Sequence, residues 1–126
     1  MQDVLASTLN EIMNAKKAGK RTCIIRNFSN LLLNVLEIMK KNKYIDEYAV
    51  EKGKFNRLII KFGEINECKA IKPRFTVTRE ETEKYIRRFL PARDFGILIF
   101  STDKGLMTQK EIDEKGIGGC LIAYCY

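Results

Sequence analysis

The chain has 126 residues, a length that fits one domain or two very small ones, and 45% of them are hydrophobic, enough for a packed core. Its 23 basic and 16 acidic residues give a net charge of +7, which favours polyanion binding, although solubility alone would also explain it. Histidine is absent, which excludes Ser-His-Asp and Cys-His active sites within the chain, and no run of about 18 apolar residues predicts a membrane span.

The first half predicts the order α-β-α-β-β. Apolar residues at helical spacing predict an amphipathic helix over about residues 3–17, with Asp3 as a possible N-cap. Residues 21–26 favour a short strand. Ser29 can cap a second helix, and residues 45–52 and 57–62 are strand-like runs on either side of a turn, which indicates a hairpin. The expected apolar face of the second helix consists of Leu32, Leu33, Leu36 and Met39.

The second half predicts the order β-α-β-α-β. Its strands are expected at residues 74–77, 95–101 and 120–126, and the middle one is apolar enough to be buried on both faces. A capping box at Thr78–Glu81 opens a helix that runs to about Phe89. A second box is expected at Thr108–Glu111, and Gly116 is a natural end for its helix. The fold class is therefore α+β in two small halves, residues 1–66 and 67–126.

The four cysteines indicate neither a metal site nor a redox motif. They form no C-x-x-C pair, and three of them lie in predicted strands, where a cysteine is usually a small buried hydrophobe. With no secretory leader, disulfides are not expected and a reducing, intracellular setting fits best. We therefore expect no metal, no cofactor and no membrane partner.

The segment from Ser101 to Gly119 carries the most functional information. It reads S-T-D-K-G-L-M-T before a short predicted helix and G-I-G-G after it. Hydroxyls, a lysine and glycines in this arrangement can lie against a phosphate backbone, whereas the phosphate-loop pattern of nucleotide-binding proteins is absent. An ordinary strand-to-helix turn followed by a loop is the structural alternative.

The basic excess is sharpest in two clusters. The cluster at Lys40–Lys43 closes a helix, where cations suit the negative end of the helix dipole. The cluster at Lys16–Arg21 lies in a glycine-containing loop and has no such explanation, so it is a candidate for phosphate contacts. Aromatic residues also interleave with basic ones, and their strand positions favour core packing over base stacking: Tyr44, Tyr48, Phe55, Phe75 and Phe95.

Several motifs occur in the order found in one known family. The chain resembles small-subunit ribosomal protein eight, called fifteen-A in animals, in its archaeal and eukaryotic branch. The matching features are the first helix up to Asn14-Ala15, Ile25-x-x-x-Ser29, Lys72-Pro73-Arg74-Phe75, Leu90-Pro91-Ala92-Arg93-x-Phe95-Gly96, S-T-x-K-G-x-M-T, G-x-G-G and the aromatic last strand, Ala123 to Tyr126. The chain departs from the family's usual residues at Asn30, Lys43 and Cys120, where lysine, glycine, and glutamate or lysine are common.

The resemblance implies a structural, non-enzymatic constituent of the small ribosomal subunit that serves translation in the cytoplasm. Its implied partners are the central domain of the small-subunit rRNA, which it helps to fold, and neighbouring small-subunit ribosomal proteins, with no small-molecule substrate. Carried over by position, the residues implied to meet RNA are Ser101, Thr102, Lys104, Gly105, Thr108, Gly118 and Gly119 in the C-terminal half. Weaker candidates are Lys16, Lys17, Arg21, Arg26, Arg74 and Arg93.

Two other classes of function stay open at this point. A small basic protein–protein adaptor would show salt-insensitive binding and no RNA in purified material. An enzyme ranks third, because no second carboxylate cluster joins acids near the glycines, such as Asp103, Asp113 and Glu114, to complete a site. If the glycines face RNA, Gly118→Val is expected to impair RNA binding more than folding.

Overall fold

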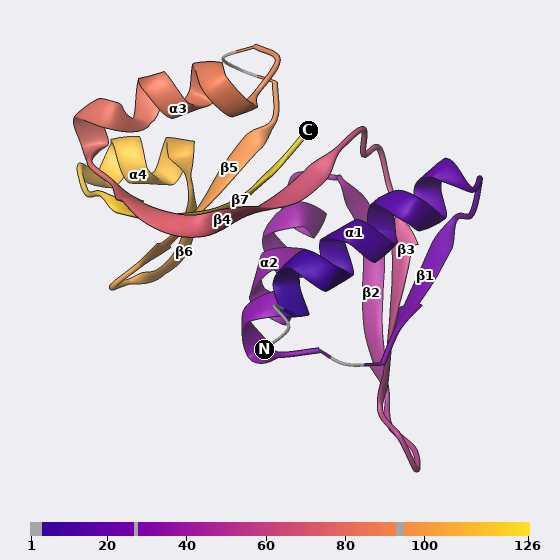
Figure 1. Ribbon diagram of the computed structural model, residues 1–126. Helices are drawn as coiled ribbons and strands as arrows, with labels where there is room; N and C mark the ends of the chain where they lie inside the picture. Colours follow the sequence, from indigo (N-terminus) through magenta and orange to yellow (C-terminus); the bar gives the residue numbers. More distant parts are fainter. Residues whose placement is uncertain (1–3, 27, 93–94) are drawn as a thin grey trace. The chain divides into compact units, whose positions relative to one another are not determined.

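The chain divides after Cys68 into two units, residues 1–68 and 69–126 (Figure 1). The structure is a computed structural model that describes residues 4–26, 28–92 and 95–126. Each unit combines helices with one antiparallel sheet, so the predicted α+β class is confirmed.

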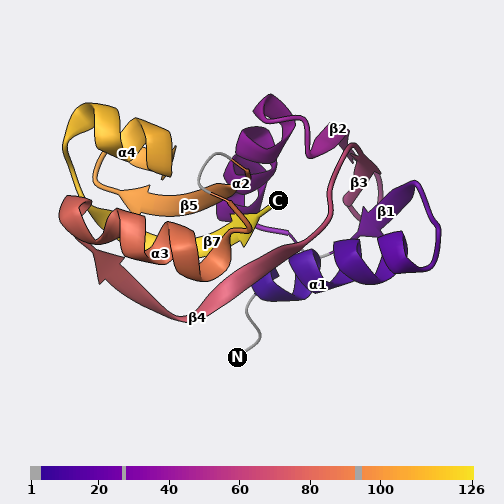
Figure 2. The same cartoon turned by 90° about the horizontal axis from the view of Figure 1, so that it is seen from above.

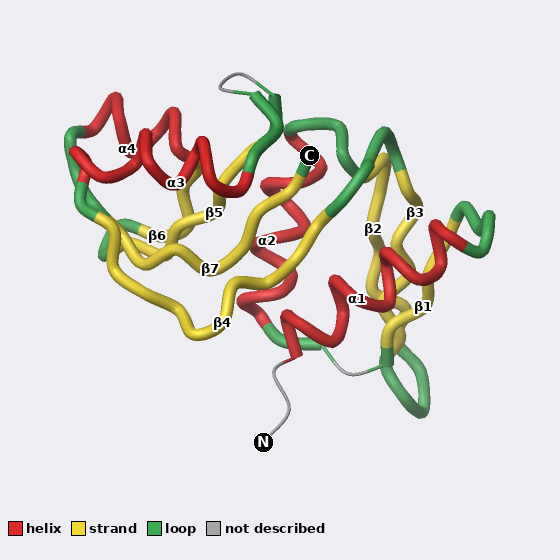
Figure 3. Tube along the Cα trace, turned by 45° about the horizontal axis from the view of Figure 1, so that its top comes forward, coloured by secondary structure: helices red, strands yellow, loops and turns green. Residues whose placement is uncertain are grey.

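Unit 1 packs two helices on one side of a three-stranded sheet (Figures 1 and 3). Its strands lie in the order β1-β3-β2, all antiparallel, and β2 and β3 form the predicted hairpin. The elements follow the predicted order: α1 (Val4–Lys17), β1 (Thr22–Ile25), α2 (Asn30–Lys41), β2 (Ile45–Glu51) and β3 (Arg57–Phe62). The predicted cap of the first helix, Asp3, lies outside the described residues.

Helix α2 begins as predicted, but its buried face differs by one residue. The Ser29 hydroxyl accepts a hydrogen bond from the Leu32 backbone N–H at 3.3 Å and caps the helix. The buried residues of the helix are Leu32, Val35, Leu36 and Met39, which form a strict i, i+3, i+4, i+7 stripe. The prediction of Leu33 in this stripe was wrong, because Leu33 lies beside it and is only partly buried.

Lys43, which connects α2 to β2, adopts a backbone conformation that favours glycine. Its φ of 66° lies in the left-handed region, where a side chain costs about 1 kcal/mol. The strained turn brings the Lys43 carbonyl to Glu64, whose N–H donates to it at 3.2 Å. The departure noted at this position in the sequence is therefore structurally costly.

We expect Lys43→Gly to raise the free energy of unfolding by about 0.5 kcal/mol, since relief of the strain exceeds the entropy that glycine adds to the unfolded chain. Chemical denaturation measures this directly. Asn42→Gly is the matched control, because Asn42 has an ordinary φ of −97° and glycine there should only destabilise. Equal losses in both variants would contradict the role of strain.

Unit 2 places two helices side by side on a four-stranded antiparallel sheet (Figures 1 and 2). The sheet order is β4-β7-β5-β6, so β7 and β5 are central. Its elements are β4 (Cys68–Val77), the 3₁₀ turn η1 (Arg79–Glu81), α3 (Thr82–Phe89), β5 (Ile97–Thr102), β6 (Gly105–Thr108), α4 (Gln109–Lys115) and β7 (Gly119–Cys125). The core of unit 2 is formed by buried apolar residues from its strands and helices. They are Ile71, Val77, Ile86, Leu90, Leu98, Phe100, Met107, Ile112 and Leu121.

Two strands of unit 2 differ from the sequence prediction. Strand β4 starts six residues before the expected Arg74, and β6 was not predicted at all. The four residues of β6 begin with a glycine and have little strand propensity, so they are strand only because β5 pairs with them. The strand expected over residues 95–101 is β5, Ile97–Thr102, and its first four residues are buried on both faces as predicted.

The caps of unit 2 are only partly as predicted. At Thr78 the capping box is confirmed, since the Glu81 carboxylate accepts from the Thr78 hydroxyl at 2.8 Å and from its N–H at 3.3 Å. These hydrogen bonds hold the pKa of Glu81 below its ordinary value. The second box was wrong, because Thr108 makes no side-chain cap bond and only contacts the Glu111 carboxylate. Gly116 ends α4 in the left-handed region, as predicted.

Candidate nucleic-acid interface

The β5–β6 hairpin presents a lysine on a turn held by its own hydrogen bonds. Thr102 pairs with Gly105, so Asp103 and Lys104 form a two-residue tip. The Thr102 hydroxyl donates to the Gly105 carbonyl at 2.7 Å and accepts from the Lys104 backbone N–H at 3.1 Å. Gly105 has a φ of 110°, which few other residues tolerate. The exposed Lys104 side chain therefore projects from a constrained backbone, and this constraint lowers the conformational entropy that is lost when the lysine binds an anion.

The G-I-G-G segment lies against the base of this hairpin. A Cβ on Gly119 would lie 2.8 Å from the Thr102 methyl carbon and 3.0 Å from the Ser101 carbonyl oxygen. The next residue, Cys120, pairs with Ser101 across β5 and β7. Segments eighteen residues apart in the predicted motif are thus neighbours because β7 pairs with β5.

The structure brings six of the expected RNA-contacting residues together. We call them the hairpin–glycine surface: Ser101, Thr102, Lys104, Gly105, Gly118 and Gly119. The backbone is accessible here, because Gly105 and Gly118 are exposed and carry no side chain. A hydroxyl, a cation and open backbone on one surface are the groups that contact phosphates and sugars.

Gly118 has a structural reason of its own. A Cβ there would lie 2.6 Å from the Val77 carbonyl oxygen and 3.2 Å from the Thr78 Cα. Both neighbours are backbone atoms, which cannot move aside cheaply. This close approach contradicts the expectation that Gly118→Val would impair RNA binding more than folding.

Thr108 does not belong to this surface. It is only 7% exposed, at the junction of β6 and α4, and its hydroxyl contacts the Glu111 carboxylate at 3.4 Å. The expectation of a direct RNA contact by Thr108 is corrected on this ground, because its hydroxyl is shielded from solvent. The last threonine of the S-T-x-K-G-x-M-T motif instead joins a strand to a helix.

The expected cations of unit 1 fall at opposite ends of β1. Lys16 and Lys17 lie in the last turn of α1 and Arg21 directly precedes β1, whereas Arg26 directly follows it. The turn at Gly19, with a φ of 80°, brings the first three close together in one cluster, with Lys17 and Arg21 exposed and Lys16 half-buried. Lys20 belongs to this cluster too and was missed as a site residue, although it stands in the basic run of the sequence.

Two expected cations of the C-terminal half, Arg74 and Arg93, are not part of the hairpin–glycine surface. Arg74 is exposed on β4, three residues before Val77, whose carbonyl meets Gly118. Arg93 lies outside the described residues. Arg79 was missed as a residue near the glycines, because its neighbours come from the distant end of α4. Its guanidinium lies near Gly116 and is 3.7 Å from the Asp113 carboxylate.

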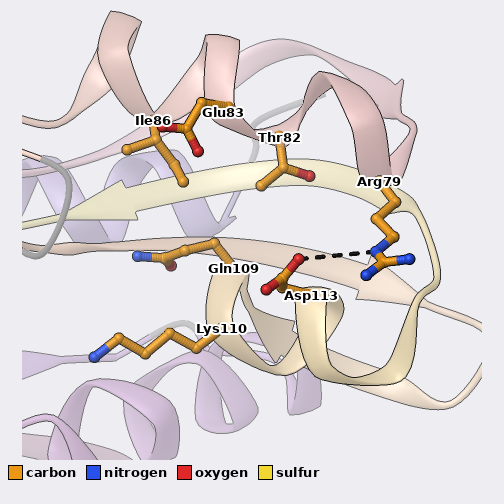
Figure 4. Close-up of a pocket in the computed structure, with 7 residues that line it drawn as sticks. All are labelled: Arg79, Thr82, Glu83, Ile86, Gln109, Lys110 and Asp113. Atoms are coloured by element: carbon orange, nitrogen blue, oxygen red, sulfur yellow. Dashed lines mark ion pairs between the residues drawn. The ribbon is translucent and has the colours of Figure 1, made fainter.

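A small cavity between α3 and α4 contains this ion pair (Figure 4). Its volume is about 210 Å³. The lining mixes two basic and two acidic side chains with neutral ones: Arg79, Thr82, Glu83, Ile86, Gln109, Lys110 and Asp113. The Arg79–Asp113 pair is exposed, and the two basic side chains of the lining balance the two acidic ones, so the cavity carries no net charge.

Two of the four cysteines, Cys23 and Cys68, are kept unreactive by burial. Burial raises the pKa of Cys68 to about 12 and also raises the pKa of Cys23, so both stay protonated near neutral pH. Within the described ranges, no group of three or more histidine, cysteine or acidic residues could hold a metal ion. Nor does any helix in that part of the chain have the length and apolar character to cross a membrane.

The comparisons with known proteins agree on one family. The family model described as ribosomal protein S8 matches residues 3–126. The chain is also 44% identical, over 126 residues, to the small ribosomal subunit protein uS8 of Archaeoglobus fulgidus, and the match covers 98% of each protein. The chain therefore belongs to the ribosomal protein S8 family and is a structural, non-enzymatic constituent of the small subunit of the cytoplasmic ribosome.

Proposed function

We propose that this protein binds the central domain of the small-subunit rRNA and stabilises its fold, with unit 2 as the main contact. One observation carries the proposal: the hairpin–glycine surface combines a constrained lysine, a serine hydroxyl and open glycine backbone on β5 and the two strands that pair with it. Such a surface follows the shape of a folded RNA backbone and contacts its phosphates and 2′-hydroxyls.

The proposed mechanism is binding without turnover. Phosphate contacts by Lys104 supply affinity that depends on salt, and the glycine backbone supplies close approach. The cluster around Lys16, Lys17 and Arg21 adds phosphate contacts from unit 1, and Arg26, Arg74 and Arg93 remain weaker candidates. Neighbouring small-subunit ribosomal proteins are the proposed protein partners.

The test of this function compares binding to a transcript of the rRNA central domain with binding to an unrelated structured RNA of equal length, at two salt concentrations. Selective binding to the central domain that weakens as salt rises supports the proposal. Equal, weak binding to both RNAs would refute it and reduce the basic surplus to generic polyanion affinity.

We expect Lys104→Ala to weaken binding to the central domain roughly three- to tenfold and to reduce the salt slope by about 0.7–0.9, because one phosphate contact is lost. Lys110→Ala is the matched control: it removes the same charge from an exposed lysine at the other end of β6. Isothermal titration or filter binding at four salt concentrations gives the slope. An effect as large in the control would refute the assignment of Lys104.

A further inference from the structure

The tip of the β2–β3 hairpin carries an aromatic side chain in solvent. Phe55 is 78% exposed, so the prediction that it packs in the core was wrong. Phe95, at 50% exposed, was also wrongly assigned to the core, but its ring contacts Tyr126. Figure 1 shows the β2–β3 hairpin extending past the end of β1, away from α1. A single exposed apolar residue is common, so exposure alone does not indicate a function.

The charges around Phe55 are what distinguish this tip. Exposed cations precede and flank the ring at Lys52 and Lys54, and Arg57 follows it at the start of β3. Ile25 pairs with Leu58, which places Arg26 beside the same end of the hairpin. A cavity of about 490 Å³ opens there, and it is lined by Arg26, Phe55, Asn56 and Arg57.

Three of these cations are not neutralised by the described residues of unit 1. Glu51 is the only acid in residues 51–57, and its carboxylate is already bonded to Arg57 at 2.6 Å. Arg26, Lys52 and Lys54 form no ion pair with any described residue. The tip therefore presents three uncompensated cations around one aromatic ring, which matches the charge of a nucleic-acid strand and opposes a basic partner.

We propose that Phe55 is a stacking platform for an unpaired base of the small-subunit rRNA, with Arg26, Lys52 and Lys54 on the adjoining phosphates. The inference rests on the proposed function and adds a second, chemically different contact in unit 1. Single-stranded nucleotides are bound by this combination, since bases stack on aromatic rings and cations follow the backbone. Asn56 lies in the same cavity and supplies amide groups toward a base edge.

The chain contains no tryptophan, so Phe55→Trp gives a single fluorescent probe at the tip. On titration with the rRNA central-domain transcript, we expect saturable quenching of this indole over the transcript concentrations at which binding occurs, because stacked bases quench tryptophan. The unrelated structured RNA should give no saturable quenching. Selective binding without quenching would overturn the stacking inference while leaving the proposed function intact, whereas loss of selectivity in the wild-type protein would overturn both.

A second set of variants tests the energetic contribution. We expect Phe55→Ala to weaken binding to the central domain about tenfold and Phe55→Tyr to restore it, in line with the usual contribution of one stacked base. Both variants should keep the wild-type thermal unfolding midpoint, because the side chain is exposed. Lys54→Gln should weaken binding, and Lys41→Gln, the same change at an exposed lysine that ends α2, should not. Unchanged affinity in Phe55→Ala would overturn the inference and assign the tip to a protein contact instead.

Discussion

Gly118→Val is expected to lower the free energy of unfolding of unit 2 by about 3 kcal/mol, a large share of the stability of a small domain. The Cβ would lie 2.6 Å from the Val77 carbonyl oxygen, so either β4 or the start of β7 must shift. Both strands carry the core of unit 2, since Val77 and Leu121 are each at most 1% exposed. Chemical denaturation followed by circular dichroism would show an earlier transition.

A matched pair of smaller substitutions separates the clash from the general effect of replacing glycine. Gly118→Ala already introduces the clashing Cβ, whereas Gly53→Ala places a Cβ with no atom closer than 3.9 Å and an ordinary φ. We expect Gly118→Ala to destabilise and Gly53→Ala to change stability by less than about 0.5 kcal/mol. If Gly118→Val folds with wild-type stability but loses RNA binding, the original expectation from the sequence is right and the packing role is wrong.

Local patterns predicted the parts of the fold that local physics determines. The Ser29 cap, the Glu81 capping box and the left-handed Gly116 each depend on residues within one turn, so their sequence patterns sufficed. The limits of β3 were predicted to the residue because a turn signal precedes this short apolar run and Gly63 follows it. Strand β6 was missed because its pairing partner, not its composition, makes it a strand.

The candidate site shows the same division. The motif placed Ser101, Lys104 and the glycines in one short segment, and the pairing of β5 with β7 brings them to one surface. Thr108 was wrongly included because sequence spacing does not report burial, which depends on α4. Phe55 was wrongly predicted to lie in the core for a related reason. Exposure alternates along the paired strands of a hairpin, but the residues of its turn do not follow that alternation.

The two units separate the contributions to binding that can be measured. The hairpin–glycine surface and the Phe55 tip belong to different sheets, so variants in one unit are expected to leave the stability of the other unchanged. Losses from Lys104→Ala and Phe55→Ala should add in free energy, because the two side chains share no described partner. A double variant therefore reports whether the two surfaces bind the same RNA at once.

Gln109→Leu is expected to cost unit 2 about 2–4 kcal/mol of stability, because it removes a side-chain amide that makes two hydrogen bonds with backbone groups, as a neighbouring strand would. The Gln109 amide accepts from the Leu98 N–H at 2.8 Å and donates to the Gly96 carbonyl at 3.0 Å, beyond the last pair of β5 with β6. Leucine has a similar volume and cannot form either bond. Since Leu98 is fully buried, its N–H would lose its partner with no water to replace it.

The control for this variant is Lys110→Leu, which makes an adjacent exposed residue apolar and should change stability by less than about 0.5 kcal/mol. Hydrogen exchange read by NMR tests the cause, because protection of the Leu98 amide should fall in Gln109→Leu by more than the global stability change explains. Retained protection would mean that the amide is held by something other than Gln109. RNA affinity should fall only through the unfolded fraction, whereas Lys104→Ala lowers affinity at full stability, and this contrast distinguishes a residue that supports the hairpin from one that contacts RNA.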